Sequence, residues 1–155
     1  MDRIKEGIIV VDGIELNNEL TIADLEKIDL DKAVQRFHPH GYMEVIFNHP
    51  VTSDGVDFQV SMRITNNEKH KLILLDPRPK DQKWHSHDAI EISREKQAIC
   101  EDWLKRNMGI EPTRDTDDGI FYDFPWGHVH SAAAEHINFG HLEGCIIVSY
   151  GEDME

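Results

Sequence analysis

A ten-residue run near the middle of the chain, Val56–Thr65, alternates apolar and polar side chains almost without exception. Successive side chains of a strand point to opposite faces of a sheet, so this alternation predicts a strand with one buried and one polar face. Strands of this kind are typical of antiparallel sheets. Apolar runs at 42–48 and 70–76 flank it across turn-rich residues. The three runs together predict a meander of consecutive antiparallel strands.

The segment before the meander predicts short elements. Residues 7–16 have the pattern of a hairpin around the turn pair Asp12-Gly13. Thr21 is a suitable N-cap for a short helix that follows it. We expect a second short helical turn after Asp31, carrying the apolar residues Ala33, Val34 and Phe37.

The segment after the meander predicts one long helix and more strands. Ser93 can cap a helix over 94–108, and Gly109 is placed to end it. Its apolar stripe consists of Ile99, Cys100, Trp103, Leu104 and Met108. Loops are expected at 49–55, 76–88 and 111–119, and strands at 120–124, 127–130 and 145–150.

Strands, then a helix, then strands again is the order of an α+β fold. We therefore expect a mostly antiparallel sheet, a meander, with helices packed on one face. At 155 residues the chain fits a single domain spanning 1–155. Cys100 and Cys145 stand among apolar residues, which favours buried thiols over a disulfide.

Charge limits the partners that this chain can have. The net charge is −14, and residues 109–155 carry −9 of it, from ten acids and one base, Arg114. Such a field repels nucleic acid and anionic lipid and attracts cationic surfaces, although high charge also serves solubility alone. No apolar run approaches the roughly 20 residues that span a bilayer. The short run at 8–11 falls short of a secretory leader, so we expect a cytoplasmic protein.

Histidine motifs suggest one alternative function. His85, His87 and Glu91 follow an H-x-H-x3-E pattern, and residues 119–130 follow G-x5-P-x-G-x2-H. These motifs resemble the two metal motifs of the cupin family. The resemblance implies a small β-barrel in which His85, His87, Glu91 and His130 hold one divalent metal ion. Because Glu91 leads into the predicted helix and not along a strand, the metal site is the alternative hypothesis and an absence of cofactors the favoured one.

A second resemblance involves the C-terminal half. Its elements are E-K-x3-C-x2-W-L from Glu95, P-W-G-x-V-x-S from Pro125, and I-I-V-x-Y from Ile146. This order is similar to small bacterial domains encoded beside polymorphic toxins, some of which are immunity proteins. The resemblance implies stoichiometric binding without catalysis, and its partner would be a cationic, nuclease-type toxin.

The acidic residues nearest these motifs are the candidate partner-binding site. They are Asp115, Asp117, Asp118 and Asp123. Their negative charges suit electrostatic steering of a basic partner. For each aspartate alone, a hydrated surface position is the simpler interpretation. A bacterial domain with an unrelated partner is the third hypothesis.

Overall fold

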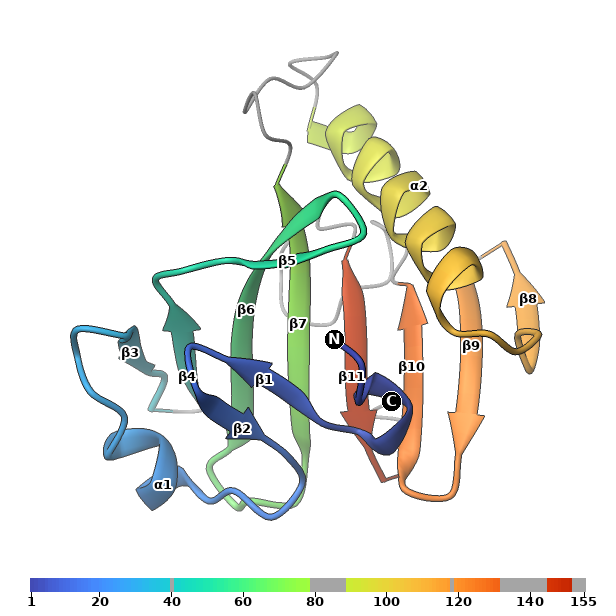
Figure 1. Ribbon diagram of the computed structural model, residues 1–155. Helices are drawn as coiled ribbons and strands as arrows, with labels where there is room; N and C mark the ends of the chain where they lie inside the picture. Colours follow the sequence, from blue (N-terminus) through green and yellow to red (C-terminus); the bar gives the residue numbers. More distant parts are fainter. Residues whose placement is uncertain (40, 79–88, 118, 132–144, 152–155) are drawn as a thin grey trace.

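The computed structural model describes residues 1–39, 41–78, 89–117, 119–131 and 145–151. These residues form one large antiparallel sheet, a small hairpin and two α-helices (Figure 1). The strands of the large sheet are β3 (Ala33–Phe37), β4 (Tyr42–Phe47), β5 (Val51–Ser53), β6 (Val56–Thr65), β7 (Lys71–Arg78), β8 (Arg114–Thr116), β9 (Gly119–Phe124), β10 (Gly127–Ser131) and β11 (Ile146–Tyr150).

The large sheet consists of two antiparallel halves. Its order is β3-β4-β6-β7-β11-β10-β9-β8, so the last strands of the two halves, β7 and β11, pair at the centre. The short strand β5 pairs with the first residues of β6, and β4 pairs with its last residues. This arrangement leaves β3 at one end of the described sheet and β8 at the other.

The remaining described elements are a 3₁₀ turn at Ile4–Glu6, the hairpin β1 (Ile9–Val11) and β2 (Ile14–Leu16), and the helices α1 (Ile22–Glu26) and α2 (Ala89–Asn107). Figure 1 shows the hairpin in front of the first half of the sheet and α2 across the second half. The main hydrophobic core contains Leu25 of α1, Trp103 of α2 and alternate residues of both sheet halves. Burial of this apolar surface is the main driving force for folding.

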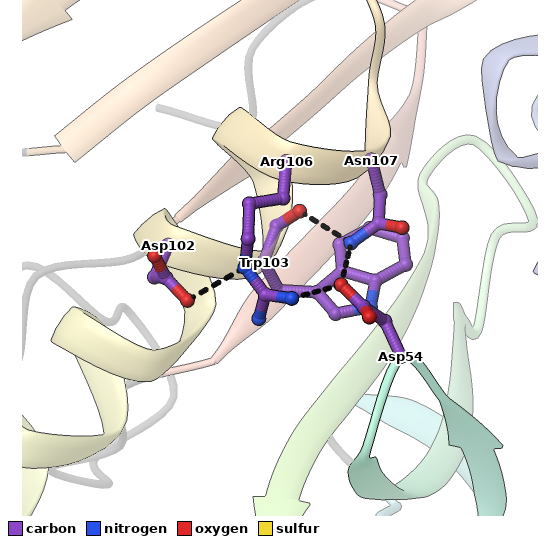
Figure 2. Close-up of polar contacts among 5 residues, drawn as sticks. All are labelled: Asp54, Asp102, Trp103, Arg106 and Asn107. Carbon is purple, nitrogen blue, oxygen red and sulfur yellow. Dashed lines mark hydrogen bonds and ion pairs between the residues drawn. The ribbon is translucent and has the colours of Figure 1, made fainter.

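The end of α2 is tied to the first half of the sheet by polar contacts (Figure 2). The carboxylate of Asp54, in the turn between β5 and β6, accepts hydrogen bonds from Arg106 and Asn107. Arg106 also donates to Asp102 at 2.9 Å, and Asn107 donates to the carbonyl of Trp103 at 2.9 Å. These contacts fix the last turn of the helix above the core that Trp103 joins.

Glycines allow the closest backbone approaches in the second half. Gly127, at the start of β10, has a φ of +150°, and a Cβ there would lie 2.1 Å from the carbonyl oxygen of Ser149. A Cβ on Gly119, at the start of β9, would lie 2.3 Å from the carbonyl oxygen of Ser131. Only glycine lets these strands start where they do.

Several predicted elements are confirmed. The alternating strand has the predicted bounds, Val56–Thr65, and the hairpin turns at Asp12 and Gly13, both with positive φ. Thr21 forms a capping box with Asp24 at the start of α1. The three strands of the predicted meander, β4, β6 and β7, are neighbours in the sheet. Gly109 follows α2 with a φ of +71°, as a helix-ending residue should.

Other predictions are wrong. Residues 33–37 form edge strand β3 and not a helical turn, because their backbone pairs with β4. The helix starts at Ala89, so Ser93 lies inside it and is buried. Two segments predicted as loops contain short strands, β5 and β8, and β7 extends through Pro77 to Arg78.

Candidate functional site

The candidate site lies at the β8 end of the sheet. Arg114 stands opposite Phe121 of β9, and Asp115 stands opposite the buried Ile120. Since neighbouring residues of a strand point to opposite faces, Arg114 and Asp115 lie on different faces of the sheet. All three residues of β8 are exposed, so this end of the sheet is short, polar and open to solvent.

Arg114 is held by two neighbours on its own face. Its Nη2 and Nε atoms donate to the carboxylate of Asp123, at 3.0 and 3.2 Å. Its guanidinium carbon lies 4.3 Å from the centre of the Phe121 ring, a cation–π distance. Arg114 is the one base among residues 109–155, so its positive charge is compensated locally by Asp123.

The four aspartates of the predicted site do not share one surface. Asp115 lies on β8 and Asp117 in the turn that follows, both exposed. Asp123 is on the opposite face from Asp115 and is paired with Arg114. Asp118 lies outside the described residues. The structure thus keeps Asp115 and Asp117 together and gives Asp123 an internal partner.

One acidic residue was missed by sequence reasoning. Glu111 precedes β8 and is exposed, like Asp115 and Asp117. Within the described ranges none of the three carboxylates makes an ion pair. The signal for Glu111 in the sequence is its place in the acidic run 111–117, four residues before Asp115. We call Glu111, Asp115 and Asp117 the acidic edge.

Two histidines stack beside Arg114 on the same face. The His130 ring lies parallel to Phe121, with centroids 4.8 Å apart and an interplanar angle of 12°. The His128 ring centre is 5.0 Å from that of His130. Burial lowers the pKa of His130 to about 3, helped by His128 and Arg114 and opposed by Asp123. His130 is therefore neutral near pH 7, and its buried Nδ1 has no hydrogen-bond partner in the described part of the chain.

The residues of the metal hypothesis are only partly described. His85 and His87 lie outside the described residues. Glu91 is exposed in the first turn of α2, and His130 lies on β10 on the face opposite the core residue Val129. Among the residues that the structure places, no three His, Cys, Asp or Glu side chains gather as a metal-binding group. The described strands form a sheet with two ends in place of the closed barrel of cupins, and the metal site stays a prediction.

Neither Cys100 nor Cys145 forms a disulfide, and both are buried. Burial raises the pKa of Cys100 well above its ordinary value, and the nearby Cys145 and Asp76 act in the same direction. A thiol of this kind stays protonated and is a poor nucleophile. The two cysteines therefore act as core residues in this structure.

No protein-family model, curated protein or solved structure matches this chain. Within the described ranges, neither α-helix combines the length and the apolar character needed to cross a bilayer.

Proposed function

We propose that the protein is a non-catalytic binding protein that neutralises a cationic, nuclease-type bacterial toxin, acting as an immunity protein. The observation that carries this proposal is the acidic edge. Three exposed carboxylates stand there without an ion pair in the described part of the chain, while the nearby Arg114 is compensated by Asp123. The edge is thus available to a basic partner.

The physical basis is electrostatic steering. A nuclease needs a cationic surface to hold nucleic acid, and a chain of net charge −14 is attracted to that surface over long range. Complementary charge mainly raises the rate of association and excludes wrong partners. A protein that covers the cationic surface blocks access of the nucleic acid, so no catalysis by the inhibitor is required.

We also infer that both helices pack on the same face of the sheet. Leu25 of α1 and three α2 residues join the same core cluster, together with alternate residues of the strands. The α2 residues are Cys100, Trp103 and Leu104. The three residues of β8 are exposed beside this packing, which is what a docking edge needs.

The test uses the product of a neighbouring toxin-like reading frame as the partner. The purified protein should abolish the nuclease activity at an equimolar ratio. The double variant Asp115→Asn, Asp117→Asn should bind at least about tenfold more slowly at low salt, because steering contributes factors of this size to association rates. Full nuclease activity in the presence of excess wild-type protein would overturn the proposal.

A matched control separates the acidic edge from net charge. The double variant Glu19→Gln, Glu26→Gln changes the charge by the same amount at two exposed positions in the N-terminal segment. It should slow association less than the acidic-edge variant does. Equal slowing by both variants would show that only the total charge matters and that the acidic edge is no docking site.

A further inference from the structure

The opposite end of the sheet, at β3, has a different character. Three large apolar side chains are exposed there, Leu30 at 72%, Val34 at 48% and Phe37 at 62%. Val34 and Phe37 point to opposite faces of the sheet, since they are three residues apart on one strand. A strand added at this edge would therefore meet apolar side chains on both faces.

The backbone of β3 has donors and acceptors directed away from the sheet. The carbonyl of Lys32 accepts from the amide of Asn48, and the amide of His38 donates to the carbonyl of Tyr42. This pattern turns the backbone groups of even-numbered residues toward β4, so those of Gln35 and Phe37 point outward. The outward amide of Ala33 is already bonded to the carbonyl of Asp29. Among the strands that the structure describes, the last part of β3 is thus an open edge for pairing.

The charge around β3 differs from that of the rest of the chain. Residues 27–37 hold three bases and two acids, a net charge of +1 in a chain of −14. This positive charge does not attract a cationic partner, but it does attract another acidic protein. The acids Asp29 and Asp31 precede the strand, and Arg36 stands near its end. An antiparallel copy of the same strand would bring the basic end of each β3 toward the acidic end of the other.

We propose that β3 is a homodimer interface, at which a second copy of this chain adds its own β3 antiparallel and extends the sheet through a two-fold axis. Each copy supplies the same outward groups of Gln35 and Phe37, as a self-complementary interface requires. The added strand would lie beside exposed Val34 on one face of the sheet and exposed Phe37 on the other. The surrounding net charge opposes the dimer, so salt should strengthen it by screening that repulsion.

The test is the oligomeric state of the full chain, measured by sedimentation velocity over a range of protein concentrations. The wild type should form a dimer whose population rises with concentration and with salt. Phe37→Asp, which adds charge and removes the apolar side chain, should weaken dimerisation at least about tenfold. Phe37→Pro removes the outward amide donor together with the ring and should act in the same direction. A wild type that stays monomeric at the highest concentration and salt would overturn the proposal.

Two controls keep the result specific. Val10→Asp changes another exposed apolar residue, 48% exposed on β1 outside the large sheet. It should leave the dimer intact, and its far-ultraviolet spectrum and that of the Phe37 variants should match the wild type. Dimerisation of Phe37→Asp as strong as that of the wild type, or loss of the dimer in Val10→Asp, would show that another surface is responsible. The dimer does not depend on the acidic edge, so Asp115→Asn should not weaken it.

Discussion

Arg63 and Arg114 have the same kind of neighbours on the same face of the sheet but differ in burial. Arg63 pairs with Glu44 and lies over the Tyr42 ring, and Arg114 pairs with Asp123 and lies over the Phe121 ring. The strand register links Arg63 to Asp123 across the sheet through Leu72, Ser149 and His128. Yet the Arg63 and Glu44 side chains are 7% and 6% exposed, against 44% and 37% for Arg114 and Asp123.

This difference shows that position in the sheet, more than residue type, decides what such a group does. Inside the sheet, the charges of Arg63 and Glu44 are both shielded from water. Each charge is therefore stabilised mainly by the other. At the β8 edge, both charges of the Arg114–Asp123 pair stay partly hydrated, so the pair contributes little to stability and its charge balance can matter for binding. Three predictions test this contrast.

The largest effect is expected for Arg63→Met, because it leaves the buried carboxylate of Glu44 without its partner. Loss of one member of a buried pair costs about 3–5 kcal/mol. The measurement is the free energy of unfolding from urea titration. The double variant Glu44→Leu, Arg63→Met removes both charges and should recover most of the loss. A loss for Arg63→Met as small as that of a surface pair would contradict the contrast.

An intermediate effect is expected from pH, through His130. Its folded pKa of about 3 lies below the ordinary 6.5, so between these values the unfolded chain binds a proton that the folded chain does not. Stability is therefore complete above pH 6.5 and falls as pH drops toward 3, by at most about 1.4 kcal/mol per pH unit for one group.

His130→Phe keeps the stack on Phe121 and removes the titrating group, so its stability should fall less steeply with acid than that of the wild type. Urea titrations at several pH values between 3 and 7 provide the slope. Identical slopes for the wild type and His130→Phe would rule out a depressed pKa at His130.

The smallest effect is expected for Arg114→Ala. The exposed pair with Asp123 contributes about 0–1 kcal/mol, so the free energy of unfolding should change little. The substitution also releases Asp123 and makes residues 109–155 more negative, so association with a cationic partner should be as fast as in the wild type or faster. Stability loss as large as that of Arg63→Met would remove the distinction between interior and edge.

The sequence was most informative where one side of an element is buried. β6 alternates because its apolar residues Phe58, Val60, Met62 and Ile64 all enter the core, so periodicity alone was enough. The Thr21–Asp24 capping box is local and needs no knowledge of the rest of the fold. Both were predicted because the physical cause lies within a few residues of the signal.

The edge strands could not be predicted because their cause is distant. In β3 only Ala33 is fully buried, and the spacing of its apolar residues suits a helix as well as a strand; pairing with β4 decides between them. In β8 no residue is buried, so its sequence has no alternation of apolar and polar residues that would predict a strand. For the same reason the bond between Asp123 and Arg114 was missed, since it depends on β8 lying next to β9.

Residues Lys5 and Gly7 are hydrogen-bonded to the turn between β9 and β10 and to β11. Trp126 donates to the carbonyl of Lys5 at 3.0 Å, and the Tyr150 hydroxyl donates to the carbonyl of Gly7, 143 positions away in sequence. During synthesis both partners emerge long after residues 5–7, so this segment can make these contacts only once β11 has been made. Contacts of such long range slow folding. A ribosome-stalled chain that lacks β11 should therefore leave its N-terminal segment accessible to proteases, however complete the first half of the sheet.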